Sequence, residues 1–394
     1  MRETQRLFYE EPGLSGARAR IIELGEGGRK LVLDRTVFYP EGGGQPCDLG
    51  TIGGIALVSV AEEAGRIVHV LSEPIAAAPG AEVELALDAA RRLDHSVQHS
   101  AQHLISAVFT RLCGAATLSF HLGASRSTID LDMPPPSDDE LAEVELRLEE
   151  AVAEDYPYLV HLCPPERASD FPLRKAPPEG EEELRIVEID GLDYSPCCGT
   201  HVSSSARLRM VKLTGVEKYK GITRLSFVAG PRAFADYCAL SRAARDSARA
   251  LGCSLLELPE RVARAAERLK ALEASLGRLE RERAGLEADL AAAKDGGLPP
   301  FVSALYADRD ADAAQEAVRA LAARRAIALA ASLPELTAVA SAPSGAARLG
   351  ERLRPMAEAS GGRGGGGPSS FRAAFRDEPA LRSFMRDASA ELGG

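Results

Sequence analysis

Three of the seven histidines in this chain of 394 residues lie close together at helical spacing. His95, His99 and His103 follow one another at intervals of four, so they share one face of a helix. Two imidazoles on adjacent turns hold zinc in the helical H-E-x-x-H motif. No Glu lies between His99 and His103, so the general base of that motif is missing. The spacing predicts half of a metal site, and the pairs 95/99 and 99/103 both remain open.

A second pair of potential metal ligands comes later, in the run Cys197-Cys198-Gly199-Thr200-His201. Cys197 and His201 are four apart, and two such pairs supply the four donors that tetrahedral zinc requires. Cys198 competes with Cys197 as the thiolate donor. Each pair alone is more simply a polar helix face or a loop with a buried thiol. Both pairs in a chain with so few histidines favour one zinc site.

The segment before the histidines has the pattern of β-structure. Apolar residues alternate in segments 29–34 and 81–87, and glycine pairs or triplets mark turns between short strands. Residues 1–90 are therefore predicted to form a small β-barrel or open sheet. The triplet Gly42, Gly43 and Gly44 permits positive φ and close backbone approach, so its N–H groups are candidates for substrate contact. A plain tight turn is the alternative.

Residues 91–250 mix helical and strand patterns. Apolar spacing of three or four predicts an amphipathic helix over 90–113 that ends near Gly114. Ser137 and Glu140 have the spacing of a capping box and predict a helix that runs to Asp155. Alternating segments at 127–132, 184–189 and within 207–228 predict strands. The fold class is therefore α+β.

In segment 255–294, mainly apolar residues recur at alternating intervals of four and three, without a break. This is the spacing of the a and d positions, which form the seam between the helices of a coiled coil. Arg283 is its one charged seam residue. A long helix that packs on its own domain is the alternative. Residues 299–394 then form a C-terminal α/β unit, with a helix at 311–325 and strands at 327–330 and 336–340. Its glycine cluster 361–367 either contacts RNA backbone, with Arg363 supplying charge, or is a flexible linker.

Composition excludes several classes of protein. The net charge is 47 − 58 = −11. This excludes a protein that coats nucleic acid with a generally basic surface. Segment 137–183 carries this acidic excess. No run of about 18 apolar residues exists, and the N-terminus lacks the apolar core of a secretory signal. Seven cysteines, an odd number, argue against a disulfide framework and favour a reducing cytoplasm.

Four motifs together resemble one family. His99-Ser-Ala-Gln-His103 and Cys197-Cys-Gly-Thr-His201 resemble the HxxxH and CxxxH zinc motifs of the alanyl-tRNA synthetase editing domain. Segment 36–46 resembles the glycine-rich motif of the preceding barrel, and segment 361–368 resembles the glycine-rich element of the C-terminal domain. The motifs occur in the family's order over nearly the whole chain. The chain is similar to free-standing alanyl-tRNA editing proteins of the AlaX type, in their long form.

The resemblance implies a zinc-dependent deacylase that acts in trans on alanine tRNA mischarged with serine or glycine. It selects His99, His103, Cys197 and His201 as ligands of Zn²⁺. A homodimer is expected from the apolar seam of segment 255–294, and the cytoplasm is expected from the cysteine usage. Candidate substrate-binding residues are Gly42, Gly43, Gly44, Gln45, Gln102, Thr117 and Arg363; Ser119 and His121 are weaker candidates.

Two positions depart from the family pattern: Cys198 replaces a usual Gly, and Gln102 stands where Thr is frequent. Both departures leave the ligands intact and concern the shape of the amino-acid pocket. A tRNA-binding or assembly factor with a structural zinc is the competing interpretation.

Overall fold

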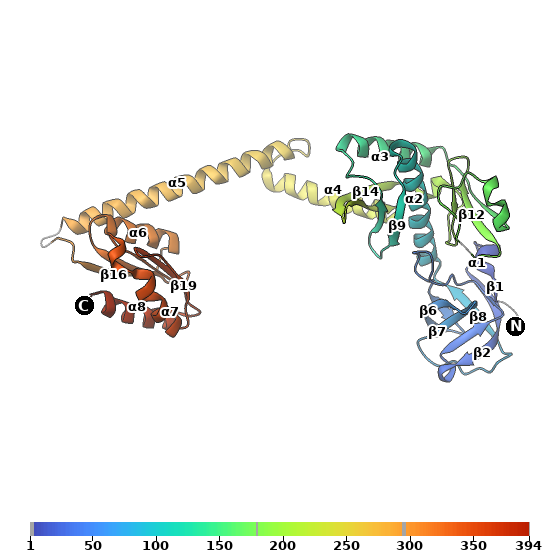
Figure 1. Ribbon diagram of the computed structural model, residues 1–394, viewed down its shortest axis with the longest axis horizontal. Coiled ribbons are helices and arrows are strands. Elements are labelled where there is room, and N and C mark those ends of the chain that lie inside the picture. Colours follow the sequence, from blue (N-terminus) through green and yellow to red (C-terminus); the bar gives the residue numbers. More distant parts are fainter. Residues whose placement is uncertain (1–3, 179, 294–296, 394) are drawn as a thin grey trace. The chain divides into compact units, whose positions relative to one another are not determined.

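The computed structural model describes residues 4–178, 180–293 and 297–393 (Figure 1). Residues 1–3 of the predicted barrel segment, residue 294 of the coiled-coil segment and residue 394 of the C-terminal unit lie outside the described residues. The chain divides into two compact units, Met1–Arg245 and Asp246–Gly394, with the boundary inside helix α4 (Pro231–Leu251). The mixed α+β class is confirmed. In the described ranges, no helix is both long and apolar enough to span a membrane.

Six antiparallel strands near the N-terminus close into a barrel in the order β2-β3-β7-β6-β5-β8. The predicted alternation is visible in β8, where Val83 and Leu85 are buried while Glu82, Glu84 and Ala86 are exposed. Short elements precede or interrupt the barrel: β1 (Gln5–Arg6), α1 (Leu7–Glu10), η1 (Glu26–Gly28) and β4 (Arg35–Thr36). The barrel strands are β2 (Gly16–Gly25), β3 (Lys30–Leu33), β5 (Gly50–Ile52), β6 (Ile55–Glu63), β7 (Arg66–Leu71) and β8 (Glu82–Leu87).

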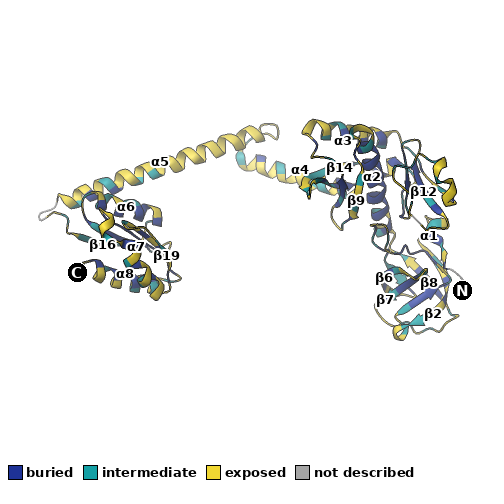
Figure 2. Ribbon diagram, in the orientation of Figure 1, coloured by how far each residue is buried: buried dark blue, intermediate teal, exposed yellow. Residues whose placement is uncertain are grey.

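Helix α2 (Ala89–Cys113) carries the histidines and is largely buried (Figure 2). The Asp88 side chain caps its start by accepting a hydrogen bond from the Arg91 backbone, and Gly114 ends it with φ of 65°. The predicted helix is confirmed, but its predicted amphipathic character is wrong. Polar residues on several faces are buried because two sheets and helix α3 (Asp138–Ala153) pack against it.

Two antiparallel sheets lie against α2. The first has the order β14-β15-β10-β9 and the second the order β11-β12-β13. The predicted capping box of Ser137 and Glu140 is present at the start of α3. Bounds are β9 (Thr117–Leu122), β10 (Ser127–Leu131), α3 (Asp138–Ala153), β11 (Tyr158–Cys163), η2 (Pro165–Asp170), β12 (Leu184–Ile189), β13 (Asp193–Pro196), η3 (Ser205–Leu208), β14 (Val211–Tyr219) and β15 (Ile222–Ala229).

The second unit contains a five-stranded sheet in the order β16-β17-β18-β20-β19, with one parallel pair between β16 and β17. Alternate residues of β17 enter two different cores, because Ala328 and Ala330 face one cluster while Leu329 and Ala331 face the other. Bounds are β16 (Phe301–Tyr306), α6 (Ala311–Ala323), β17 (Ile327–Ser332), β18 (Thr337–Ser341), η4 (Gly345–Ala347), α7 (Leu349–Ala359), β19 (Arg363–Gly365), β20 (Ser370–Ala374) and α8 (Glu378–Gly393).

Helix α5 (Leu258–Ala292) covers most of the predicted coiled-coil segment and is mostly exposed (Figure 2). Its buried residues, Ala284 and Ala288, are not seam positions, and α5 contacts α6 of its own unit. Seam leucines such as Leu269 and Leu279 remain 58% and 60% exposed. The alternative of packing on its own domain therefore holds for one end of the helix, and coiled-coil pairing stays a prediction.

The glycine cluster near the C-terminus is packed rather than being a flexible linker. Strand β19, which lies within the cluster, pairs with β20. A Cβ on Gly362 would lie 2.4 Å from the Phe375 ring, and one on Gly366 would lie 2.0 Å from the Ser370 carbonyl oxygen. Carbon atoms need about 3.5 Å or more, so close packing within this unit accounts for these glycines.

Candidate metal centre and its pocket

Four side chains from two separate segments converge in the first unit. His99 and His103 lie on consecutive turns of α2, and Cys197 and His201 lie in the loop after β13. One donor atom from each lies within 4.8 Å of the other three. Cys197 Sγ is 3.3 Å from His99 Nε2 and 3.4 Å from His201 Nε2. Tetrahedral zinc with bonds of about 2.3 Å to sulfur and about 2.0 Å to nitrogen separates its donors by about 3.3–3.6 Å, so both distances from Cys197 Sγ match such a site.

The two competing residues lie outside this cluster. His95 is buried, and its charged neighbours are Arg91, Asp94, Asp48 and Arg232 rather than the cluster. Burial lowers the pKa of His95, and its Nδ1 has no hydrogen-bond partner among the described residues. Cys198 is exposed. The structure thus brings together the four residues that the resemblance selected.

Gln45 fixes the tautomer of His99. Its Oε1 lies 2.9 Å from His99 Nδ1 and also accepts a hydrogen bond from the Thr200 backbone N–H. Because an amide oxygen can only accept a hydrogen bond, Nδ1 of His99 must carry the proton. Nε2 then keeps its lone pair, which faces Cys197 and can bind a metal. Gln45 was expected to bind substrate, but the structure buries it behind the cluster as an orienting residue.

The other histidines have polar neighbours behind them too. Ser100 Oγ lies 3.1 Å from His201 Nδ1. Asp193 Oδ2 lies 3.7 Å from His103 Nδ1, beyond hydrogen-bond distance, and this nitrogen has no hydrogen-bond partner among the described residues. Burial opposes ionisation of the Cys197 thiol, but the three imidazoles outweigh it and hold its pKa well below the ordinary value. Burial lowers the pKa of His201 to about 3. The thiolate and neutral imidazole are the forms that bind metals.

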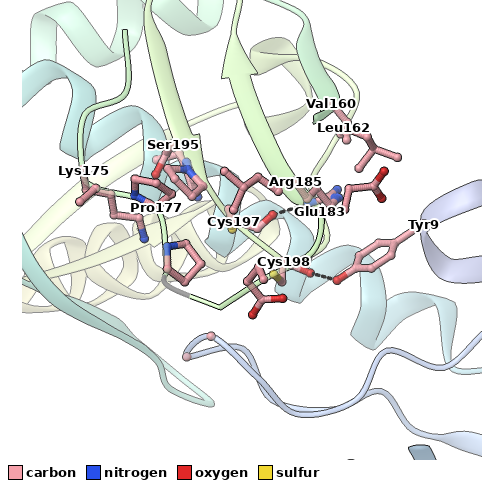
Figure 3. A pocket seen from close by; sticks show the side chains of 18 of the residues that line it. Tyr9, Val160, Leu162, Lys175, Pro177, Glu183, Arg185, Ser195, Cys197 and Cys198 are labelled. Carbon is pink, nitrogen blue, oxygen red and sulfur yellow. Dashed lines mark hydrogen bonds between the residues drawn. The ribbon is translucent and has the colours of Figure 1, made fainter. Parts of the chain in front are cut away.

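Two residues hold the backbone of the cysteine loop. The Arg185 guanidinium donates to the carbonyls of Cys197 at 2.7 Å and Gly199 at 3.0 Å. The Tyr9 hydroxyl donates to the carbonyl of Cys198, and the Arg185 guanidinium packs over its ring (Figure 3). Burial raises the pKa of Tyr9, so the phenol keeps the proton that it donates. Three successive carbonyls are therefore bound, which fixes the loop between Cys197 and His201.

The cluster lies at the wall of a cavity of about 1430 Å³ within the first unit. His103 and Cys197 line it, and so do five candidate substrate-binding residues: Gly43, Gly44, Gln102, Thr117 and the weaker candidate Ser119. Gly43 and Gly44 have φ of 56° and 80°, as the glycine pattern allowed. Gly42 accepts a hydrogen bond from Tyr39 and is not among the lining residues. Arg363 lies in the second unit, on β19, and is exposed.

Sequence reasoning missed several residues around the metal centre: Tyr9, Ser100, Arg174, Arg185 and Asp193. Most come from distant segments and have no local pattern that ties them to the histidines. Arg174 is an example, since it binds Asp193 through Nε at 2.7 Å and thereby orients the carboxylate beside His103. Ser100 is the exception, because it directly follows His99 in the sequence. A serine next to a ligand histidine is the one sequence signal that could have pointed to an orienting residue.

One family matches the part of the chain that includes the cysteine loop. Residues 184–226 match the family described as threonyl and alanyl tRNA synthetase second additional domain. This segment contains Arg185, Cys197 and His201, so it supplies two of the four clustered side chains and the arginine that holds their loop.

Three relatives show how far the similarity extends. The chain is 37% identical over 222 residues to the mouse (Mus musculus) alanyl-tRNA editing protein Aarsd1, covering 55% of this chain and 52% of the relative. It is 33% identical over 241 residues to the alanyl-tRNA editing protein AlaX-L of Pyrococcus horikoshii, covering 58% and 59%. It is 33% identical over 306 residues to the alanine–tRNA ligase of Methanopyrus kandleri, covering 74% and 33%.

The chain spans about half the length of the editing proteins that it matches, and a third of the ligase. The ligase match covers 74% of this chain, so it extends beyond the 245 residues of the first unit. Named editing proteins and a ligase for the same amino acid are both related to it, as the four motifs predicted. By sequence, the chain is a relative of the AlaX-type alanyl-tRNA editing proteins.

Proposed function

We propose that this chain hydrolyses the ester between a wrongly attached amino acid and alanine tRNA, acting in trans. The observation that carries the proposal is the Cys/His₃ cluster at the wall of a large cavity, to which His103 and Cys197 contribute directly. The similarity to proteins named for alanyl-tRNA editing supports it. The seven free cysteines are consistent with action in a reducing cytoplasm.

The donor set of the cluster suits zinc. One thiolate and three imidazoles are nitrogen and sulfur ligands, whereas magnesium and calcium prefer oxygen. When bound, zinc would polarise the ester carbonyl or activate water for attack. The protein's own contribution is to hold the four donors in place: Gln45 and Ser100 orient two imidazoles, and Arg185 and Tyr9 fix the loop.

Gly43 and Gly44 are proposed to contact the terminal adenosine or the ester carbonyl through their backbone N–H groups. Both line the cavity and have positive φ. A Cβ on Gly44 would come within 3.0 Å of the Phe120 ring, so a larger residue would close this approach. Residues 1–90 and 91–250 would thus form one editing module, because the glycine loop and two of the metal ligands line the same cavity.

The amino acid is proposed to be serine, or glycine, with Thr117 as the first candidate for reading a serine hydroxyl and Gln102 as the second. Both line the cavity beside His103. A hydrogen bond to the serine hydroxyl would be lost with alanine, which would leave a polar group of the protein unpaired. Such a loss can give discrimination of about 10⁴ in favourable cases.

The test is deacylation of seryl-, glycyl- and alanyl-tRNA side by side, with and without a chelator. We expect seryl-tRNA to be hydrolysed and alanyl-tRNA to be spared. Chelation should stop hydrolysis while circular dichroism stays native, because the first unit has extensive apolar cores of its own. Hydrolysis that continues at full rate after complete metal removal would contradict a catalytic metal.

One observation favours a second candidate function, a tRNA-binding or assembly factor with a structural zinc. Four protein donors already complete a tetrahedral site, as in structural zinc centres. The same experiment separates the two functions. A structural zinc predicts that the chelated protein unfolds and that the metal-loaded protein hydrolyses none of the three esters.

We also propose that the second unit binds tRNA, dimerises the protein, or does both. The seam leucines of α5 form an exposed apolar stripe, which a second helix of the same kind would cover. Sedimentation should show a dimer for the intact chain and a monomer for a fragment of residues 1–250. A monomeric intact chain would instead mean that this stripe is covered within the chain or stays exposed.

A further inference from the structure

Ser106 lies directly behind the cavity wall and binds both candidate specificity residues. Thr117 Oγ1 donates to Ser106 Oγ at 2.7 Å, and Gln102 Nε2 donates to the same oxygen at 2.8 Å. Ser106 is fully buried and is not among the cavity-lining residues, whereas Gln102 and Thr117 are. One buried hydroxyl therefore joins two side chains that line the cavity.

The backbone brings these three residues together through the turn after α2. Gln102 and Ser106 are one helical turn apart, so they lie on the same face of α2. Gly114 ends the helix in the left-handed conformation, and Thr110 Oγ1 donates to the carbonyl of Ala115 across the turn. The chain then returns as β9, whose first residue is Thr117. A rigid helix end and its turn thus set the distance between Thr117 and Ser106.

The hydrogen-bond inventory determines what the cavity wall offers to a ligand. A hydroxyl has one proton and two lone pairs, and an amide has two protons and one acceptor oxygen. Ser106 Oγ uses both lone pairs to accept from Thr117 and Gln102. Thr117 has then spent its only proton, so its oxygen can only accept from a ligand. The wall beside His103 therefore presents an acceptor at Thr117.

We propose that Ser106 is a positioning residue that fixes the hydroxyl of Thr117 as an acceptor, so that the pocket selects amino acids whose side chain donates a hydrogen bond. This inference rests on the proposed deacylase function. Serine supplies such a donor at its β-hydroxyl. Alanine supplies none and leaves the Thr117 oxygen desolvated without a partner. Glycine has no side chain, so its hydrolysis does not depend on the direction of the Thr117 hydroxyl.

The experiment compares kcat and KM for seryl- and glycyl-tRNA in Ser106→Ala. The variant frees the Thr117 proton, which can then rotate toward the ligand and compete with the serine hydroxyl. We expect kcat/KM for seryl-tRNA to fall about tenfold, the effect of one lost hydrogen bond, with glycyl-tRNA nearly unchanged. Ser106→Thr keeps the hydroxyl and should restore the selectivity.

A matched control is Ser127→Ala, which removes another fully buried hydroxyl of the same unit. Among the described residues, Ser127 Oγ has no hydrogen-bond partner, and Ser127 does not line the cavity. This variant should keep the wild-type ratio of seryl to glycyl hydrolysis. Should Ser106→Ala not fold, Ser106→Cys replaces it, since a thiol is a much weaker acceptor in a side chain of similar shape.

A double-mutant cycle with Thr117→Val tests whether Ser106 acts through Thr117. If it does, Ser106→Ala adds no further loss of selectivity in the Thr117→Val background. An additive loss, an unchanged ratio, or an equal fall for both esters would overturn the role of Ser106. If the wild-type chain hydrolyses none of the esters, the proposed deacylase function fails and this inference fails with it. That result differs from the previous ones, in which the wild-type chain is active and only the role of Ser106 is refuted.

Discussion

His99→Ala should abolish stoichiometric zinc binding, whereas His95→Ala should keep close to one zinc ion per chain. Both residues are buried histidines on the same helix, one turn apart, so the pair is well matched. Of these two histidines, His99 is the one that places an imidazole nitrogen beside Cys197 Sγ, at 3.3 Å. Removing it leaves three donors, and the Cys197 thiol then loses one of the imidazoles that depress its pKa.

We expect the rate of deacylation to fall at least about 100-fold in His99→Ala. Removing only a residue that hydrogen-bonds to a metal ligand already lowers metal affinity or activity by about 10–100-fold, and His99 is itself a ligand. His95→Ala should lower the melting temperature through the cavity that it leaves, with activity retained. Metal content by mass spectrometry and hydrolysis of seryl-tRNA measure the two effects. Equal loss of zinc from both variants would contradict the ligand assignment.

The ligand residues could be predicted because their geometry is local. A spacing of four places His99 and His103 on one helix face, and Cys197 and His201 stand equally close in one loop. Spacing alone left two histidine pairs and two cysteines open, and the family resemblance selected among them. Local patterns also gave the helix end at Gly114 and the capping box at Ser137.

The residues around the ligands could not be predicted, because their contacts join segments far apart in sequence. Gln45 reaches His99 across 54 positions, and Tyr9 reaches Cys198 across 189. No periodic pattern records such contacts. The glycine-rich motif correctly predicted that Gln45 lies near the site. Its role depends on the direction in which the side-chain amide points, and only the fold determines that direction.

Burial of α2 shows a related limit. Apolar spacing predicted a helix with a polar face toward solvent, yet Gln98, Ser100 and Ser106 are fully buried. Each of these polar side chains has a hydrogen-bond partner inside the protein. A polar residue with an internal partner and a polar residue in water look alike in a sequence, so the buried network behind the cavity was invisible there.

Gly199→Ala should disable the metal centre, even though Gly199 contributes no ligand. A Cβ at this position would lie 2.0 Å from Cε1 and 2.2 Å from Nδ1 of His99, and 2.9 Å from Gln45 Oε1. These atoms are the ligand ring and the amide that orients it. Non-bonded carbon atoms need about 3.5 Å, so the ring, the amide or the loop must move.

The loop has little freedom to move away from the added methyl group. The carbonyl of Gly199 accepts from Arg185 at 3.0 Å, and the next residue, Thr200, is bound through its backbone N–H to Gln45. We therefore expect the His99 ring to be displaced. Zinc affinity and hydrolysis of seryl-tRNA should then both fall by about 100-fold or more, beyond the usual effect of an outer partner.

Gly13→Ala is the matched control for this prediction, because a Cβ at Gly13 would have no heavy atom within 4 Å. Both variants add one methyl group to a glycine of the first unit, so a general effect of the substitution should appear in both. Zinc titration with a competing chelator compares their affinities. If Gly199→Ala retains wild-type affinity, the Arg185 and Gln45 contacts do not hold the loop against His99, and the metal centre is more adaptable than its packing implies.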